Sequence, residues 1–272
     1  MVGGRAAADA VARARGSPTL RVGLHLVLVC GRPVSPPGSV PDLVDAEGRF
    51  SSRLVRAGFA YFFRRRVKDQ LRAEIRAQFA RFRESGLELD HVNAHNHMHL
   101  HPTVLGLILE IGREFGVPAV RVPYEPFWAS WRATRETPVA RLASALSMWP
   151  LTTLMRRRLG RAGIFVNDRV FGLNDTGRLN RDRLGRLLSR LPDGVSEIYC
   201  HPATRHWPDM DPLMAHYQVE DELAALVDPE IVAMVRRGGI EQVAFRDLAI
   251  SGGESATMGA PREPGSRGGR RA

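Results

Sequence analysis

The hydrophobic positions of the chain form short unbroken apolar runs that alternate with longer amphipathic stretches. The first run, residues 20–30 (LRVGLHLVLVC), is rich in leucine and valine and predicts a strand that is buried on both faces, as in parallel sheets. Residues 59–85 follow a helical period, with apolar side chains every four positions from Phe63 to Phe79. Gly86 is expected to end that helix.

The same alternation continues toward the C-terminus. Further strands are predicted at residues 87–95, 117–122, 163–170, 196–200 and 242–245. Further helices are predicted at residues 103–115, with Thr103 as the N-cap, within residues 123–163, and at residues 180–191, 220–227 and 229–237. Strands that alternate with helices indicate an α/β fold with a parallel sheet. We expect residues 1–250 to form one domain and residues 251–272, which are rich in Gly, Ser, Pro and Arg, to form a disordered tail.

The basic composition does not indicate nucleic-acid binding. The formal net charge is +10, but Lys68 is the single lysine and every other basic side chain, histidine aside, is arginine. Such a preference for arginine indicates a genome-wide codon bias rather than a selected basic surface. Part of the excess charge lies in the predicted tail. No recognition helix, zinc finger or set of stacking aromatic residues accompanies it. We therefore expect no nucleic-acid partner.

Cysteine content and hydropathy favour a cytoplasmic protein. Two cysteines, Cys30 and Cys200, are too few for a disulfide framework, as expected in a reducing compartment. The first twenty residues lack the apolar core of a signal peptide. The longest uncharged stretch lies between Arg141 and Arg156 and is shorter than the roughly 20 residues that a membrane span needs.

Histidines dominate one short segment. Five of the nine histidines lie between His91 and His101, in the sequence HVNAHNHMHLHP. Alternate residues of a strand share one face, so His91, Asn93, His95 and His97 are predicted to point the same way. At the C-terminal end of a barrel strand this face carries the active site. Because imidazole is the most common protein ligand of zinc-like metals, the segment predicts a metal site. A surface cluster without a function is the alternative.

Two further histidines occur in or after predicted strands. His25 lies inside the apolar run, where an imidazole is costly unless its nitrogens have partners. A metal ion or a simple hydrogen bond would satisfy them. His201 directly follows the strand predicted at 196–200 and is placed to act as a general acid. Its neighbour Cys200 is interpreted as a buried apolar residue rather than a nucleophile, because adjacent residues of a strand point to opposite faces.

Arg121 and Glu125 flank the sequence RVPYE, which follows the strand predicted at 117–122. Their opposite charges and their place after a strand suggest an ion pair that orients the site, or a contact to a bound sugar. A purely structural pair explains the same pattern equally well.

Residues 127–161 combine aromatic, apolar and basic side chains. Three of the four tryptophans lie there among leucines and methionines, and Arg156, Arg157 and Arg158 follow. This combination is typical of a helix that lies on an anionic bilayer. Peripheral contact with the inner face of the membrane is therefore one hypothesis, and a helical lid packed on the domain is the other.

These motifs together resemble the YdjC/ChbG family of carbohydrate deacetylases, relatives of the NodB polysaccharide deacetylases. The matching pieces are VGLHLVL at 22–28, HVNAHNHMHLHP at 91–102, RVPYEP at 121–126 and SEIYCHPAT at 196–204. The resemblance extends over residues 1–248. The pieces VPDLVDAEGRF and EIYCHPATRHW are most similar to the hopanoid-biosynthesis-associated branch, which implies a hopanoid glycolipid as the substrate.

The resemblance implies a distorted (β/α) barrel and the metal-dependent hydrolysis of the N-acetyl group of an N-acetylglucosamine-type sugar. Family members hold a divalent ion, Mg²⁺ or Zn²⁺, with one aspartate and two histidines, and these histidines correspond to His25 and His95. By the same resemblance His201 is the general acid or the transition-state stabiliser. His97 and His99 are expected to line the site without ligating the ion.

One departure from the family pattern concerns the start of the domain. The family begins with a strand that ends in Asp-Asp-Phe-Gly, which supplies the metal-binding aspartate and the general base, and this motif is absent from the sequence. We therefore expect the first strand and helix of the barrel to be missing. The alternative to an active deacetylase is a catalytically inactive, metal-binding remnant of the family.

Overall fold

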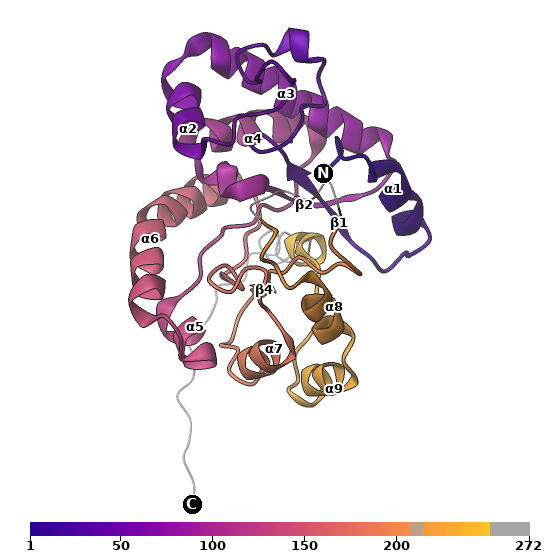
Figure 1. Cartoon of the computed structure of the whole chain (residues 1–272), viewed down its shortest axis with the longest axis vertical. Helices are drawn as coiled ribbons and strands as arrows, with labels where there is room; N and C mark the ends of the chain where they lie inside the picture. Colours follow the sequence, from indigo (N-terminus) through magenta and orange to yellow (C-terminus); the bar gives the residue numbers. More distant parts are fainter. Residues whose placement is uncertain (208–209, 211–213, 251–272) are drawn as a thin grey trace, which may run out of the picture.

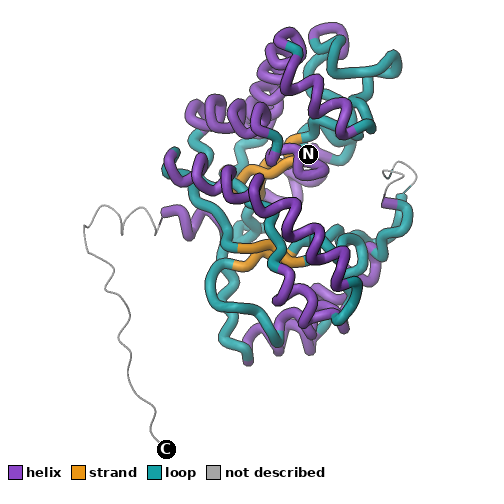
Figure 2. The backbone as a smooth tube through the Cα atoms, turned by 90° about the vertical axis from the view of Figure 1, so that its left-hand side faces the viewer, coloured by secondary structure: helices purple, strands orange, loops and turns teal. Residues whose placement is uncertain are grey.

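Two pairs of parallel strands occupy the centre of the molecule, and helices surround them (Figures 1 and 2). The computed structural model describes residues 1–207, 210 and 214–250, so the tail predicted at 251–272 lies outside the described residues. Strand β1 (Val22–Leu26) pairs with β2 (Leu89–Ala94), and β3 (Arg169–Phe171) pairs with β4 (Ser196–Ile198).

The helices connect these strands in chain order. Before β2 come α1 (Ala7–Arg15), the 3₁₀ turn η1 (Pro37–Ser39), α2 (Leu54–Phe63) and α3 (Arg65–Glu84). Between β2 and β3 come the 3₁₀ segment η2 (His95–Leu100), α4 (Pro102–Phe115), α5 (Phe127–Thr134) and α6 (Pro138–Arg161). Helix α7 (Arg181–Leu188) connects β3 to β4, and α8 (Val219–Val227) and α9 (Pro229–Arg237) follow.

Two further extended segments join the strand pairs. The amide of Val92 donates to the carbonyl of Ala119, and the amide of Val120 donates to the carbonyl of Phe165. Both bridges are parallel, so the extended segments lie side by side in the order in which they occur in the chain. This arrangement confirms the α/β fold with parallel strands. The described residues form no closed barrel, and the barrel therefore stays a prediction.

The helix predicted at residues 59–85 is in fact two helices. Helix α2 ends at Phe63, and Arg64 takes an extended conformation (φ −95°, ψ 112°) before α3 begins. Phe63 is therefore 71% exposed, because it belongs to α2 and not to the apolar stripe of α3. That stripe is buried as predicted and consists of Val67, Leu71, Ile75, Phe79 and Phe82.

Two other expectations about the elements were wrong. Helix α4 begins at Pro102, and His101 caps it by accepting a hydrogen bond from the backbone N–H of Thr103 (3.3 Å), so Thr103 is not the N-cap. Residues 242–244 form no strand and residues 245–250 are helical. Phe245 packs there against His91, with 4.6 Å between the ring centroids. This side-chain contact, and not pairing with a strand, holds the segment against β2.

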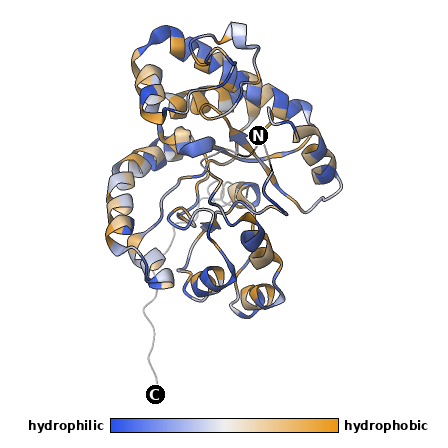
Figure 3. Cartoon of the chain, in the orientation of Figure 1, coloured by the Kyte–Doolittle hydropathy of each residue, from blue (hydrophilic) through white to orange (hydrophobic). Residues whose placement is uncertain are grey.

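The buried side chains form two hydrophobic clusters. The larger one joins β1, β2, α2, α3 and α4 with the C-terminal half of α6, and the smaller one joins α5, α7, α8 and α9. Figure 3 shows hydrophobic and hydrophilic residues alternating along the peripheral helices, as expected where one face of a helix packs inward. Among the described residues no helix combines the length and the hydropathy that crossing a bilayer requires.

The stripe of α3 provides a test of this packing. Leu71 is 0% exposed, and Leu71→Ala is expected to lower the free energy of unfolding by about 2–5 kcal/mol, because the truncation leaves a cavity. The control Val55→Ala, at a position that is 75% exposed, is expected to change it by less than about 0.5 kcal/mol. Urea unfolding measures both values. Equal effects of the two substitutions would contradict the packing of α3.

Candidate active site

Histidines from three distant parts of the chain meet near the ends of the strands. His25 lies on β1, His95 begins η2 directly after β2, and His201 follows shortly after β4. The ring centroids of His25 and His95 are 5.7 Å apart, in an edge-to-face arrangement. Burial lowers the pKa of His201 to about 4, and the nearby ring of His95 adds to the shift. The parallel strands therefore bring together the three histidines that the sequence singled out.

Tyr199 connects the histidines of η2 to His201. Its ring centroid lies 5.8 Å from that of His97 and 4.6 Å from that of His201. Its hydroxyl oxygen and Nε2 of His201 are 2.7 Å apart, a hydrogen-bond distance. Sequence reasoning missed Tyr199. The signal was the alternation of Glu197, Tyr199 and His201, which share one face of an extended segment.

The alternation predicted for the histidine-rich segment was wrong beyond Ala94. Strand β2 ends there, and Asn96 (φ 49°) and His97 (φ 54°) take left-handed backbone conformations within η2. Asn adopts this conformation more readily than most residues do, whereas a bulky side chain in it is uncommon and needs support from its surroundings. His95 and His97 therefore lie in a turn, and they do not extend the face of the strand.

His25 is a neutral imidazole at pH 7. Burial lowers its pKa to about 3, although the hydrogen bond between its Nδ1 and Oδ1 of Asn93 (2.5 Å) acts in the opposite direction. With Nδ1 engaged, Nε2 is the nitrogen left for a ligand. The ring of His95 lies next to that of His25, with 5.7 Å between the centroids, and a metal ion shared by the two stays a prediction.

The ligand set for such an ion is incomplete in this part of the chain. Among the described residues no three His, Cys, Asp or Glu side chains are grouped as they are in metal sites. His25 and His95 supply two nitrogens, whereas zinc sites in proteins use at least three protein ligands. The carboxylate that the family pattern leads one to expect has no counterpart here, so the described side chains do not by themselves fit a resident metal.

His97 and His99 are also held in their neutral forms. Burial lowers the pKa of His97 to about 4, and the charge of Arg121 adds to the shift. His99 is fully buried with a pKa well below its usual value, and its Nδ1 accepts a hydrogen bond from the backbone N–H of Ala94 (3.1 Å). Nδ1 of His97 is buried with no hydrogen-bond partner within the described ranges, and it is therefore available to a bound molecule.

His201 is fixed through its backbone as well as through its ring. Its backbone N–H donates to the carboxylate of Glu222 on α8 (2.6 Å). Burial lowers the pKa of the ring to about 4, and Nδ1 has no partner in the described part of the chain. Burial also raises the pKa of the Cys200 thiol to about 11. A protonated thiol is a poor nucleophile, in agreement with the interpretation of Cys200 as an apolar residue.

Arg121 and Glu125 do not pair with each other. Arg121 forms a salt bridge with both carboxylate oxygens of Glu197, and its guanidinium lies 5.1 Å from the centre of the Tyr199 ring. Glu125 instead accepts a hydrogen bond from the hydroxyl of Ser130 and lies 3.7 Å from the guanidinium of Arg141. Arg121 thus belongs to the histidine cluster, and Glu125 belongs to a separate buried network.

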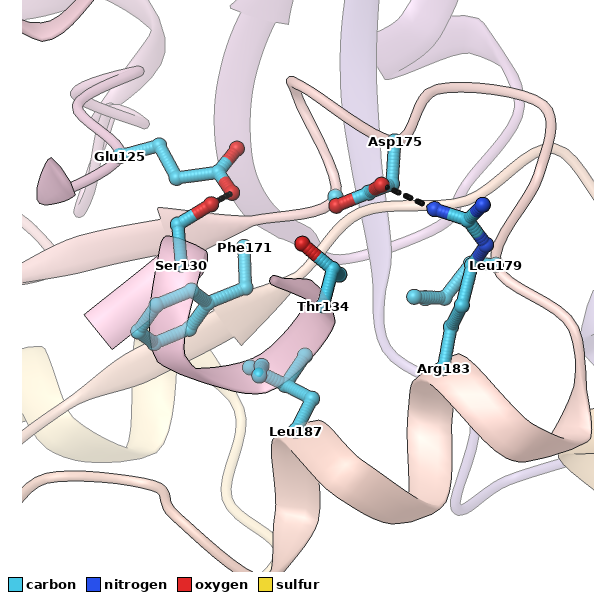
Figure 4. A pocket seen from close by; sticks show the side chains of 10 residues that line it. Glu125, Ser130, Thr134, Phe171, Asp175, Leu179, Arg183 and Leu187 are labelled. Atoms are coloured by element: carbon cyan, nitrogen blue, oxygen red, sulfur yellow. Dashed lines mark hydrogen bonds and ion pairs between the residues drawn. The ribbon is translucent and has the colours of Figure 1, made fainter. Parts of the chain in front are cut away.

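This second network lies beside a small pocket lined by residues of α5, α7 and the segment between β3 and α7 (Figure 4). Arg141 is 1% exposed and forms two hydrogen bonds with Asp175, at 2.7 and 2.9 Å. Arg183 on α7 also donates to Asp175, at 2.7 Å. Burial raises the pKa of Glu125. The network ties α5, α6 and α7 together, and no local pattern marked Arg141 as a core residue.

Comparison with known proteins identifies the family. Residues 1–237 match the model of a family described as YdjC-like protein. The chain belongs to the YdjC-like family. This finding confirms the family resemblance that the motifs indicated, whereas the assignment to the hopanoid-associated branch and the missing first strand and helix stay predictions.

Relatives of this YdjC-like chain include proteins named carbohydrate deacetylase. One from Geobacillus stearothermophilus is 30% identical over 244 residues, which cover 89% of this chain and 82% of that protein. One from Mus musculus is 30% identical over 269 residues, which cover 91% of this chain and 84% of that protein. One from Brevibacillus brevis is 43% identical over 118 residues, but this match spans only 43% of that protein.

A solved structure shows the same fold. The crystal structure of a protein from Enterococcus faecalis V583, described as a cellobiose-phosphate cleavage protein, superposes with a TM-score of 0.60. The match covers 88% of this chain and 82% of that chain, at 23% sequence identity. At this identity the likeness supports the mixed α/β architecture and carries no argument about the reaction.

The buried histidines predict a pH dependence of stability in the metal-free protein. His25, His97 and His201 have pKa values of about 3, 4 and 4 in the folded state, against about 6.5 in the unfolded chain. Between these values the unfolded state binds more protons, so the free energy of unfolding falls as the pH drops below 6.5. His97→Gln is expected to make this fall shallower by about 1 kcal/mol per pH unit.

Urea unfolding at pH 7.5, 6.0 and 5.0 measures the slope. His206→Gln, at an exposed position, is the control and should leave the slope unchanged. The same slope for wild type and His97→Gln would show that His97 can be protonated in the folded state.

Proposed function

We propose that this YdjC-like protein hydrolyses the N-acetyl group of an N-acetylglucosamine-type sugar. The relatives that align with 89% and 91% of the chain carry the name carbohydrate deacetylase. The observation that carries the proposal is the contact of His25 with His95, together with His201, which Tyr199 connects to His97 of the same turn and to Arg121. Imidazole N–H groups and a guanidinium can stabilise the negative charge that develops on an acetamide oxygen under attack.

His201 is proposed to stabilise the transition state rather than to act as a general acid. A general acid must carry a proton at the working pH, whereas burial lowers the pKa of His201 to about 4. The neutral ring still donates one hydrogen bond. When the hydroxyl of Tyr199 donates to Nε2, the hydrogen of the ring is on Nδ1, which has no other partner among the described residues. This N–H is suited to the acetamide oxygen.

His25 and His95 are the proposed ligands of a divalent ion, Mg²⁺ or Zn²⁺. The two imidazoles are of the right kind and lie edge to face, and the neutral ring of His25 ligates a metal without first losing a proton. Two ligands do not complete a site, so no catalytic step is assigned to the ion. His97, His99 and Arg121 are proposed to contact the sugar or to orient these ligands, while Glu125 supports the fold from its own network.

The general base is the missing part of the proposed site. The carboxylates that contact the cluster have partners of their own: Glu197 binds Arg121, and Glu222 accepts from the backbone N–H of His201. Other candidates are engaged elsewhere, since Asp90 binds His91, and Glu125 and Asp175 belong to the network of Arg141. Releasing either of the latter two would leave a buried guanidinium with fewer partners, which is strongly unfavourable. This engagement supports the alternative proposal, a catalytically inactive remnant of the family that binds a metal weakly.

The more specific substrate that we propose is a lipid-linked sugar, such as a hopanoid glycolipid. Helix α6 presents an outward apolar stripe whose members are 42% to 79% exposed, namely Val139, Leu142, Leu146 and Trp149. Arg157 is exposed further along the helix. An apolar stripe with a following cation supports peripheral contact with an anionic bilayer. Met155 is fully buried in the core and has no part in this stripe.

Acetate release from a soluble N-acetylglucosamine oligosaccharide tests the reaction. With Zn²⁺ or Mg²⁺ present, His201→Ala is expected to lower kcat about 10²–10³-fold, because it removes a hydrogen-bond donor to the oxyanion of the transition state. The exposed His206→Ala is the control and should retain full activity. Wild-type activity at background level would favour the inactive remnant, and an active His201→Ala variant would exclude the role of His201.

Co-sedimentation with phosphatidylglycerol vesicles tests the membrane contact. The double substitution Leu146→Ser and Trp149→Ser is expected to weaken binding at least about fivefold, because it removes the apolar anchor. Val227→Ser, at a position on α8 that is 67% exposed, is the control. Equal binding of the double variant and the wild type would leave the helical lid as the explanation of α6.

A further inference from the structure

We propose that Asp90, His91 and Asn93 form a hydrogen-bonded chain that fixes the tautomer of His25. In this chain His25 carries its hydrogen on Nδ1, so that Nε2 keeps its lone pair for a ligand. The three are positioning residues, since none of them needs to touch the substrate. The relevance of the chain to catalysis rests on the proposed function, whereas the tautomer itself does not.

Three consecutive contacts define the chain. Oδ2 of Asp90 lies 2.8 Å from Nδ1 of His91, and Nε2 of His91 lies 3.1 Å from Nδ2 of Asn93. Oδ1 of Asn93 lies 2.5 Å from Nδ1 of His25. All three contacts are within hydrogen-bond distance. They run from the start of β2 across to β1, where His25 and Asn93 are register partners.

Asp90 determines which group donates and which accepts in each of these hydrogen bonds. An ionised carboxylate only accepts hydrogen bonds, so His91 must donate from Nδ1. Nε2 of His91 faces the amide nitrogen of Asn93, which can only donate, so Nε2 accepts. The amide oxygen of Asn93 is left to accept, and His25 must donate from Nδ1. Each step permits only one direction for the next.

Asp90 is well placed to remain ionised. Its other oxygen, Oδ1, accepts a hydrogen bond from the backbone N–H of Arg246 (3.0 Å). Burial opposes ionisation of Asp90, but the hydrogen bonds from His91 and from the backbone of Arg246 outweigh it and lower the pKa. The carboxylate therefore has a defined accepting role on each oxygen.

Packing against Phe245 and the space left by Gly23 hold the ring of His91 in place. Its ring lies against Phe245, with 4.6 Å between the centroids. On the other side a Cβ atom on Gly23 would approach the ring to 2.5 Å, so a side chain at this position would displace His91. Gly23 thus leaves room for the ring, and the segment that contains Phe245 and Arg246 holds both ends of the Asp90–His91 pair.

The chain matters because the two tautomers of His25 differ in what they offer to the cluster. With the hydrogen on Nδ1, Nε2 presents a lone pair on the ring that neighbours His95. With the hydrogen on Nε2, the same position presents a donor and cannot ligate a metal. Hydrogen bonds behind a ligating histidine orient ligands in this way at metal sites generally.

The test is ¹⁵N NMR of the histidine rings in the metal-free protein, which distinguishes the two tautomers by the shifts of the protonated and unprotonated nitrogens. The His25 signals are assigned by their loss in His25→Gln. Wild-type His25 is expected to be the Nδ1–H tautomer. An Nε2–H signal for wild-type His25 would overturn the proposal.

Asp90→Asn tests the chain from its far end. The asparagine keeps an oxygen for the backbone of Arg246 and presents an N–H₂ group to His91, so the direction of every following hydrogen bond reverses. His25 is then expected to become the Nε2–H tautomer, although the substitution is three contacts away. Glu88→Gln removes a neighbouring carboxylate that pairs with Arg21 and Arg246 and lies outside the chain, and it should change nothing. An unchanged His25 in Asp90→Asn would overturn the proposal.

Asn93→Asp gives a second, independent measurement. The aspartate can only accept, so His25 is expected to stay the Nδ1–H tautomer while His91 gains a hydrogen on Nε2. Loss of the Nδ1–H tautomer in this variant would also contradict the chain. Because all of these signals are read without metal or substrate, failure of the deacetylase assay would refute the proposed function and leave the tautomer result standing.

Discussion

The parallel register between β1 and β2 is the constraint on which the site depends. It sets His25 opposite Asn93 and starts η2 beside the end of β1, so that His95 lies 5.7 Å from His25. A slip by one residue would turn every side chain of β1 to the opposite face. Leu24 and Leu26 prevent this, because both are 0% exposed and would lose their buried contacts. Core packing and site geometry are thus determined by the same register.

The pattern of hydrophobic and polar residues predicted the positions of strands and helices better than it predicted which side chains contact one another. The apolar run around His25 predicted a strand, and the four-residue period predicted helix α3. Both predictions succeeded because the positions that a helix or strand buries recur with the period of that element. A period of two could not reveal that Asn96 and His97 take positive φ angles, since no pattern in the side chains encodes that turn. Arg121 finds Glu197 76 residues along the chain, a distance over which the local pattern carries no information.

The charge balance of the cluster follows from burial. Burial keeps His25, His97 and His201 neutral at pH 7, so the positive charge among them comes from Arg121. Glu197 compensates that charge through its salt bridge. The result is a site with little net charge and several polar N–H and lone-pair positions, which suits a neutral sugar amide better than a charged substrate. A developing oxyanion meets fixed dipoles there and needs no rearrangement of water.

The carboxylates that contact the cluster already have partners, since Glu197 binds Arg121 and Glu222 accepts from the backbone N–H of His201. Asp175 accepts hydrogen bonds from both Arg141 and Arg183, which occupy its carboxylate oxygens. Asp90 is occupied by His91 in the same sense. Three buried histidine nitrogens have no partner among the described residues, namely Nδ1 of His97, Nε2 of His99 and Nδ1 of His201. The latter two carry the ring hydrogens, because Nδ1 of His99 accepts from Ala94 and Nε2 of His201 accepts from Tyr199, so Nδ1 of His97 is the one that can accept a proton. A nitrogen with a pKa of about 4 accepts a proton from water only weakly. Efficient hydrolysis therefore requires a stronger base than these described side chains provide.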